Sequence, residues 1–458
     1  MFDLPSRLGA TEASGCISLK KTTSWTKKRK NSIVLFRTFR YNKDDIPTGW
    51  YLEIGVQAQR KTEGTIMHLR LTDEQRMVQK AIRKFVEKEL MPLENEVLRN
   101  EREGKPGLPP EKLKELQLKA KESGFWGINT PEEYGGANLG HVMQAIVLME
   151  VSKTFVPFQF GGSADNILYY ANEEQKKKYL IPTINGEKKS CFAMTEPGAG
   201  SDTRNIQMTA IKDGNEWVLN GEKTFITGGN DADFVMVIAI TDKERHQASK
   251  GREGVTCFIV DREMGWRSEP IHTMGPATPA SLIFENVRVP EENILGELHH
   301  GYQLGLEWIG YARWVVGARA VGAAERLLQM AIDYAKERVT FGKPIAERQA
   351  IQWMIADSAV EIEAAKWLVL NAAFTLDQGE DNRHLASMAK LFGANMGNRV
   401  VDRVLQIHGG MGYTKEMPIE RWYREARLWR IYDGTDEIQR LIIARNLIKG
   451  HVKLGQFI

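Results

Sequence analysis

An aspartate precedes a glycine–threonine pair on a short loop near the C-terminus, in the run Tyr432-Asp433-Gly434-Thr435. A loop between two helical runs is well placed to point such a carboxylate into a pocket, where it can act as a general base. The same residues suit a helix boundary, because Gly434 can end one helix while Thr435 caps the next, with Glu437 in its first turn. On this local pattern alone, the helix boundary is the favoured interpretation.

The loop belongs to a longer segment, residues 406–445, that resembles the C-terminal signature of the acyl-CoA dehydrogenase family. Three more segments resemble the same family: MTEPGAGSD at 194–202, NGEKTFIT at 220–227 and RVTFGKP at 338–344. One such motif is a weak signal, but four in the family's order are specific. The resemblance covers residues 68–450 and implies an enzyme that uses FAD to oxidise an acyl-CoA.

The resemblance implies one group of cofactor contacts in the middle of the chain. In the family, FAD lies between the β domain and the C-terminal helices, and acyl-CoA inserts against it. Glycines in the turn at 194–202 allow the backbone to approach a flat ligand closely. Ser201 also falls where the family contacts substrate, and Phe225 stands where many members have Trp. The implied cofactor-binding residues of this group are Phe192, Met194, Thr195, Gly200, Ser201, Phe225, Ile226 and Thr227.

A second implied group lies in the C-terminal part. Arg338, Thr340 and Gln349 match family positions that reach the flavin pyrophosphate and adenosine across a subunit interface, and an Arg–diphosphate bond suits that role. Further matching positions that approach the same cofactor are Gln406, Gly409, Gly410, Thr435 and Glu437. Because two subunits share the site in the family, we expect a homodimer or homotetramer.

Two arginines match substrate positions of the family. Arg313 and Arg445 correspond to positions near the CoA moiety. An arginine taken singly is more often part of a helix-surface ion pair. The four matching motifs favour the substrate interpretation.

Asp433 is the α-proton base that the resemblance implies. In the family's reaction a carboxylate removes the α-proton of the thioester while the β-hydrogen leaves as hydride to flavin N5. Desolvation raises the pKa of a carboxylate and makes it a better base. Most members carry Glu here, although some branches use Asp. The family's second base position holds Ala312, so Asp433 is the main candidate and Glu307 the next residue to test.

Composition excludes several function classes. The 458 residues carry a net charge of +3, which gives no global basic field for nucleic acid. Cys16, Cys191 and Cys257 are far apart and lack C-x-x-C spacing, so we expect neither a disulfide framework nor a metal site. No apolar run reaches membrane-spanning length. We expect a cytoplasmic protein without membrane or nucleic-acid partners, with the mitochondrial matrix as the alternative compartment.

The order of elements predicts an α+β fold with the acyl-CoA dehydrogenase architecture. Residues 67–188 are predicted to be an N-terminal helical domain, which Thr72 opens with a capping-box pattern. Residues 189–299 are predicted to be an antiparallel β domain, and residues 300–458 a C-terminal helical bundle. Within the β domain, Asp213-Gly214 and Asn220-Gly221 both have the sequence of a hairpin turn.

Residues 1–66 differ in composition from the rest. They carry 12 lysines and arginines against 6 acidic residues, including the run KKRK at 27–30, and show no periodicity. We expect a mis-called start codon, with the true protein beginning at Met67. A targeting peptide or a nucleic-acid-binding tail is the functional alternative.

The predicted function is α,β-dehydrogenation of an acyl-CoA to a trans-2-enoyl-CoA, with electrons passing to an electron-transfer flavoprotein or a similar acceptor. One alternative is a flavoprotein oxidase of the same fold, either a nitroalkane oxidase or an acyl-CoA oxidase. The other is a flavin-bearing protein that binds nucleic acid or a partner without dehydrogenase activity. The presence of Asp433 counts against this last alternative.

Overall fold

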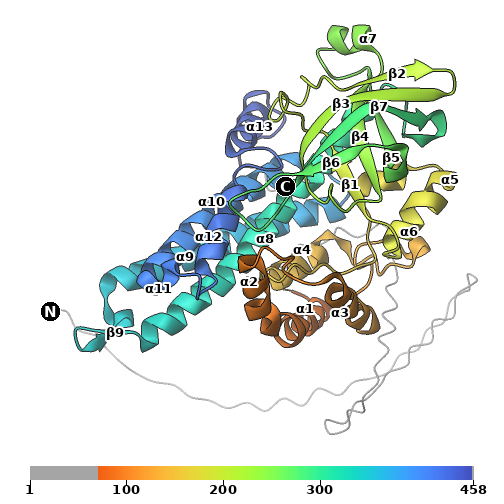
Figure 1. Cartoon of the computed structure of the whole chain (residues 1–458). Coiled ribbons are helices and arrows are strands. Elements are labelled where there is room, and N and C mark those ends of the chain that lie inside the picture. Colours follow the sequence, from red (N-terminus) through yellow and green to blue (C-terminus); the bar gives the residue numbers. More distant parts are fainter. Residues whose placement is uncertain (1–70, 456–458) are drawn as a thin grey trace, which may run out of the picture. The chain divides into compact units, whose positions relative to one another are not determined.

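The computed structural model describes residues 71–455 (Figure 1). The expected leader, residues 1–66, lies outside the described residues, so the hypotheses about it stay predictions. Within the described part, no helix combines the length and the apolar character needed to cross a bilayer.

Helices form the first part of the described chain, as predicted. Thr72 opens α1 with a capping box, in which Thr72 Oγ1 accepts a hydrogen bond from the Gln75 N–H at 3.1 Å and Gln75 Oε1 accepts one from the Thr72 N–H at 3.0 Å. These bonds satisfy two amides that a helix start leaves unpaired. The elements are α1 (Asp73–Phe85), η1 (Val86–Leu90), η2 (Met91–Leu93), α2 (Glu94–Arg102), α3 (Pro110–Glu122), η3 (Glu132–Tyr134), α4 (Gly140–Val151), η4 (Asn166–Tyr170), α5 (Glu173–Gln175), η5 (Lys176–Leu180) and α6 (Ile181–Ile184).

A sheet with the order β6-β7-β3-β2-β4-β5-β8 follows, and β1 pairs with β4. Most pairings are antiparallel, as predicted, but β1 runs parallel to β4, and β2 meets β4 in parallel at Thr209 and Ile240. A parallel neighbour is possible because a whole hairpin separates β1 from β4 in the chain. The elements are β1 (Ser190–Ala193), β2 (Thr209–Asp213), β3 (Glu216–Ile226), β4 (Phe234–Ile240), α7 (Lys243–Ala248), β5 (Val255–Asp261), η6 (Arg262–Met264), β6 (Arg267–Pro270), β7 (Ala280–Pro290), η7 (Glu291–Asn293) and β8 (Ile294–Leu295).

The two predicted hairpin turns differ in outcome. Asp213-Gly214 does connect β2 to β3, with Gly214 at φ +63°. Asn220-Gly221 was wrongly predicted to be a turn, because both residues lie inside β3. The register with β7 shifts between Leu219 and Gly221, and a Cβ on Gly221 would lie 2.8 Å from the Met208 side chain. The glycine therefore serves a β-bulge and a close approach, two other uses of glycine in strands.

The central strand β4 is buried on both faces. Val235 and Val237 belong to a core within the sheet, whereas Phe234 and Met236 belong to a core that also contains residues of η4, η5 and the start of α8. One strand thus joins the sheet to helices from both ends of the chain.

Helices return in the last part. Figure 1 shows α8, α9 and α10 running side by side, and their facing residues share the largest hydrophobic core. The elements are α8 (Gly301–Glu337), β9 (Val339–Thr340), β10 (Lys343–Pro344), η8 (Ile345–Glu347), α9 (Gln349–Asp377), α10 (Arg383–His408), α11 (Gly410–Tyr413), α12 (Ile419–Leu428) and α13 (Asp436–Ile448). The expected domain boundaries at 188/189 and 299/300 remain a proposal.

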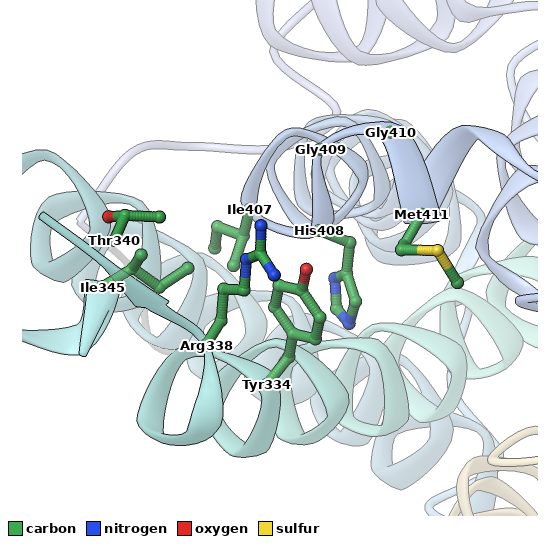
Figure 2. Close-up of a pocket in the computed structure, with 9 residues that line it drawn as sticks. All are labelled: Tyr334, Arg338, Thr340, Ile345, Ile407, His408, Gly409, Gly410 and Met411. Carbon is green, nitrogen blue, oxygen red and sulfur yellow. The ribbon is translucent and has the colours of Figure 1, made fainter. Parts of the chain in front are cut away.

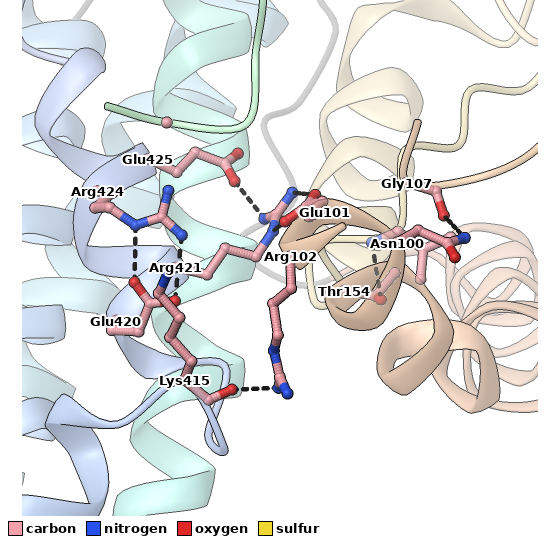
Figure 3. Close-up of polar contacts among 12 residues, drawn as sticks. Asn100, Glu101, Arg102, Gly107, Thr154, Lys415, Glu420, Arg421, Arg424 and Glu425 are labelled. Carbon is pink, nitrogen blue, oxygen red and sulfur yellow. Dashed lines mark hydrogen bonds and ion pairs between the residues drawn. The ribbon is translucent and has the colours of Figure 1, made fainter. Parts of the chain in front are cut away.

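An ion-pair network connects α12 to α2 (Figure 3). Buried Arg421 of α12 lies 2.9 Å from Glu101 of α2 and 2.7 Å from Glu425 one turn further on. Its neighbour Arg424 donates a hydrogen bond to the Met274 carbonyl at 2.7 Å, which connects a loop of the β region to the same helix. These contacts fix α12 just before the loop that carries Asp433.

Asp377, the last residue of α9, caps the N-terminus of α4. Its carboxylate accepts hydrogen bonds from the backbone N–H groups of His141 at 2.6 Å and Val142 at 3.0 Å, and it lies 2.8 Å from His141 Nδ1. Burial opposes ionisation of Asp377, but these hydrogen bonds outweigh it and lower its pKa. An acid with a lowered pKa stabilises the fold above its usual titration range, and the stabilisation is lost as the pH falls through the folded-state pKa.

We therefore predict that Asp377→Ala lowers the free energy of unfolding by about 1–2 kcal/mol at pH 7, as expected for loss of a helix cap. The difference from wild type should shrink as the pH falls below about 4, where aspartate protonates. Denaturant unfolding at several pH values measures both effects. Asp333→Ala, which removes an exposed carboxylate on α8, is the control and should change stability little. Equal stability of Asp377→Ala and wild type at pH 7 would contradict the prediction.

Candidate active site

A buried ion pair shapes the turn at residues 194–202. Lys223 Nζ lies 2.7 Å from Glu196 Oε1 and donates to the Met194 carbonyl at 3.1 Å. Glu196 also accepts hydrogen bonds from the backbone N–H groups of Gln207 at 2.6 Å and Met208 at 3.1 Å. Burial lowers the pKa of Lys223 to about 8, although the Glu196 carboxylate opposes that shift. With these partners the pair fixes the start of the turn, and the segment that leads into β2, against β3.

Thr195 and Phe225 lie together as a result. The Thr224 N–H donates to the Thr195 carbonyl at 2.8 Å, which brings the end of β3 beside the turn. Phe225 is 62% exposed and has φ +58°, a left-handed conformation that is costly for an aromatic residue. Such strain persists only where surrounding contacts enforce it, and it is concentrated at functional sites. The exposed ring is available to cover a ligand.

The other predicted residues of this group differ in exposure. Phe192 and Met194 are buried, and Phe192 stacks on Trp308 of α8 with ring centroids 4.6 Å apart. Ile226 is also buried, inside the sheet, so only its backbone can face a ligand. Gly200, Ser201 and Thr227 are exposed.

Asp433 lies between α12 and α13, half-buried, with a left-handed backbone at φ +53°. Burial raises the pKa of its carboxyl group, although Arg319, Lys390 and Arg313 nearby oppose the shift. A carboxylate with a raised pKa is a stronger base while it stays ionised.

The helix-boundary interpretation of this loop is confirmed in part. Thr435 does cap α13, with its Oγ1 accepting from the Ile438 N–H at 3.4 Å, and exposed Glu437 lies in the first turn. Gly434 does not end a helix, because α12 ends at Leu428. Asp433 and Gly434 instead belong to a turn between the helices.

The two predicted substrate arginines differ in burial. Arg313 on α8 is buried, burial lowers its pKa, and its Nε has no hydrogen-bond partner among the described residues. A helix-surface ion pair therefore does not explain Arg313. Arg445 is exposed on α13 and forms no ion pair with any residue in the range 71–455.

A separate cavity of about 480 Å³ gathers part of the second predicted group (Figure 2). Its lining includes Arg338 at the end of α8, Thr340 in β9, and Gly409 with Gly410 at the end of α10. The space beside the two glycines is open, and Arg338 forms no ion pair with a residue that the structure describes. Gln406 and Gln349 are exposed but do not line this cavity.

Sequence reasoning missed two aromatic rings of this cavity. Tyr334 stacks on His408 with ring centroids 4.3 Å apart, and His408 Nδ1 lies 2.8 Å from the Val404 carbonyl. Burial lowers the pKa of His408, which favours the neutral ring. Tyr334 precedes Arg338 by one helical turn, so the i, i+4 spacing is the signal that could have identified it.

The first group of predicted cofactor residues and the part of the second group that lines the cavity lie at opposite ends of α8. Thr435 and Glu437 of the second group lie elsewhere, beside the Asp433 turn. Gly305, in the second turn of α8, packs against Met194, whereas Arg338 directly follows the last residue of this 37-residue helix. At 1.5 Å per residue the two ends are roughly 50 Å apart. A ligand much shorter than this cannot contact both the first group and the cavity residues within a single copy of the chain.

Family models described as the acyl-CoA dehydrogenase N-terminal, middle and C-terminal domains match residues 72–187, 191–287 and 299–448. The chain belongs to the acyl-CoA dehydrogenase family. It is therefore an oxidoreductase of a family that generally binds FAD.

Individual members are similar over nearly their whole length. The chain is 40% identical to a 3-(aryl)acrylate reductase of Clostridium sporogenes, over 82% of this chain and 99% of that protein. It is 39% identical, with the same coverage, to subunit CarC of the caffeyl-CoA reductase–Etf complex of Acetobacterium woodii. The structure of butyryl-CoA dehydrogenase from Megasphaera elsdenii matches with a TM-score of 0.74 and 33% identity, over 83% of this chain and all of that chain.

The buried ion pair gives a prediction about stability. Glu196→Gln and Lys223→Met should each cost about 3 kcal/mol, because each leaves its buried partner uncompensated. The double variant should cost clearly less than the sum of the two. A double-mutant cycle from denaturant unfolding measures this coupling. Breaking the exposed Lys212–Glu291 pair with Lys212→Met is the control and should cost less than about 1 kcal/mol. Additive single effects at Glu196 and Lys223 would contradict the prediction.

Proposed function

We propose that the protein catalyses FAD-dependent α,β-dehydrogenation of an acyl-CoA thioester, with Asp433 as the α-proton base. The observation that carries this proposal is the half-buried carboxylate of Asp433 in a left-handed turn, with buried Arg313 close by. Family membership supplies the reaction class, and the Asp433 turn supplies the base.

The described residues fit FAD. Arg338, without an ion-pair partner in residues 71–455, and the open backbone at Gly409 and Gly410 suit a diphosphate. Thr195 and the exposed Phe225 ring suit the flat end of the cofactor. FAD, when bound, accepts the two electrons that leave the substrate.

The length of α8 supports a site that two copies of the chain share. One copy offers Thr195, Phe225 and Asp433, and another offers Arg338 with Gly409 and Gly410. We therefore propose a homo-oligomer in which neighbouring subunits complete each other's cofactor sites.

In the proposed reaction, Asp433 removes the proton from the carbon next to the thioester carbonyl. Its raised pKa favours this transfer, because burial makes the proton-free carboxylate a better acceptor. Arg313 holds a positive charge beside the turn, which favours the negative charge that develops on the thioester. Ser201 and Arg445, both exposed, are proposed to contact the CoA part of the substrate. An electron-transfer flavoprotein is the proposed electron acceptor, since a similar protein is a subunit of an Etf complex.

A second candidate function is the same reaction in reverse, reduction of an enoyl-CoA. Two of the similar proteins above are reductases, which favours it. Steady-state turnover separates the two directions: a dehydrogenase reduces an added electron acceptor at the expense of acyl-CoA, and a reductase consumes enoyl-CoA at the expense of an added electron donor, so the faster direction decides. Rapid reoxidation by oxygen alone would instead support the oxidase alternative.

The cofactor proposal predicts that the protein purifies with one FAD per subunit, as an oligomer. Arg338→Ala should weaken FAD affinity by about 10–100-fold, as expected for loss of a charge-assisted hydrogen bond. Flavin absorbance after dialysis measures the loss. Arg252→Ala removes an exposed arginine of the β region and is the matched control. Unchanged FAD affinity in Arg338→Ala would remove this residue from the proposed site.

The base proposal predicts that Asp433→Asn keeps FAD and enoyl-CoA affinity but slows flavin bleaching by several orders of magnitude, because both the base and its alignment are lost. Rapid-mixing absorbance measures the rate. Glu307→Gln is the control: Glu307 accepts hydrogen bonds from the Tyr170 hydroxyl at 2.8 and 3.0 Å and should not be the base. If Asp433→Asn bleached at a near-normal rate and Glu307→Gln did not bleach, Glu307 rather than Asp433 would be the base.

A further inference from the structure

Two fully buried side chains hold the turn that carries Asp433. Lys390 of α10 donates from Nζ to the Gly434 carbonyl at 2.9 Å. Gln439 of α13 donates from Nε2 to the same carbonyl at 2.8 Å and to the Asp433 carbonyl at 3.2 Å. Both carbonyls of the turn are therefore bound from inside the protein.

The backbone that they hold is strained. Asp433 and Gly434 have φ values of +53° and +87°, so two successive residues are left-handed. A non-glycine residue in this region is uncommon and needs surrounding contacts to keep it there. The hydrogen bonds from Lys390 and Gln439 supply such contacts, and they fix the direction in which the Asp433 side chain leaves the backbone.

The charge of Lys390 has no close partner. No described carboxylate lies within ion-pair distance of its Nζ, and the nearby acid Asp436 is bound by Arg430 at 2.8 Å and Asn395 at 2.9 Å. Burying an ammonium group with only carbonyl contact is unfavourable for stability. A group placed at such a cost is a candidate for a functional role.

Several charged groups surround the turn. Arg313 and Arg319 approach Asp433 from α8, Lys390 approaches it from α10, and Asp436 and Glu437 lie at the start of α13. Burial lowers the pKa of Lys390 to about 8, although Asp436 and Asp433 oppose the shift. At neutral pH Lys390 is therefore mostly charged, and its charge acts on the Asp433 carboxylate.

We propose that Lys390 is a positioning residue for Asp433: through the Gly434 carbonyl it holds the turn, and through its charge it keeps the carboxylate ionised. Gln439 also holds the turn, but because it is neutral it does not keep the Asp433 carboxylate ionised. This inference rests on the proposed role of Asp433 as the base.

The test compares Lys390→Met with Lys390→Arg in the full-length holoenzyme. Lys390→Met should slow flavin bleaching by acyl-CoA by about 10–100-fold, since small misplacements of a catalytic group have effects of this size. It should also move the acid limb of the pH–rate profile upward by about one pH unit, because a nearby cation lowers the pKa of a carboxyl group. Lys390→Arg keeps the charge and should keep the limb of wild type.

The direction of the pH shift separates this role from a merely structural one. If Lys390 only supported the fold, its loss would admit water around Asp433, and the acid limb would move downward. FAD content, enoyl-CoA affinity and melting temperature report independently whether the variant is intact. Should Lys390→Met not fold, Lys390→Gln replaces it in the test. Gln keeps a hydrogen-bond donor but no charge, so the acid limb should again move upward.

Gln439→Met separates positioning from charge. It removes both hydrogen bonds to the turn and no charge, so bleaching should slow without an upward shift of the limb. Lys366→Met is the matched control, because Lys366 is a partly buried lysine of α9 paired with Glu325 and Glu363, away from the turn. It should leave both rate and limb unchanged.

Two kinds of failure are distinguishable. The role of Lys390 would be overturned if Lys390→Met kept the wild-type bleaching rate and acid limb, or if its acid limb moved downward. A shifted acid limb in Lys390→Arg would overturn it as well. An upward shift in Gln439→Met would also overturn it. The proposed function would instead be overturned if no acyl-CoA bleached the flavin of the wild type. It would also be overturned if acyl-CoA still bleached the flavin of Asp433→Asn.

Discussion

The length and rigidity of α8 separate the two parts of the proposed cofactor site. Its first turns pack into the core beside β4, where Trp308 stacks on Phe192, and its last residue delivers Arg338 to a cavity at the far end. A helix of 37 residues packed along α9 and α10 cannot bend to bring these ends together. Under the proposed function each copy carries two half-sites, and assembly of copies, rather than an internal movement, would complete them.

Several buried charges lie around the proposed site. The Lys223–Glu196 pair shapes the turn beside Phe225, while Lys390 and Arg313 approach Asp433. Replacing buried charges with apolar groups often stabilises proteins, so stability alone does not explain their presence. A water-poor site makes each fixed charge more effective on a developing negative charge. Under the proposed function, the unfavourable burial of these groups prepares the site for reaction.

Local sequence predicted the elements well where short-range contacts decide the structure. The capping box at Thr72 and the turn at Asp213-Gly214 depend on neighbouring residues alone. Asn220-Gly221 has nearly the same local pattern but lies in a strand, because its pairing with β7 and the nearby Met208 decide the outcome. The motifs single out Arg338 and Asp433 as candidates, but Lys390 is 44 positions before the carbonyl it binds, and no local pattern reveals that contact.

The aspartate at position 433 can be understood from the backbone beneath it. Asp is one methylene shorter than the Glu of most members, so the reach of its carboxylate depends more on the direction of the backbone than on side-chain rotamers. A free turn could adjust to either acid. This turn is bound at two successive carbonyls by buried donors, and both residues are left-handed. The position of the carboxylate is thus set by α10 and α13 as much as by the residue itself, and the shorter acid belongs to a turn whose geometry is fixed from outside the loop.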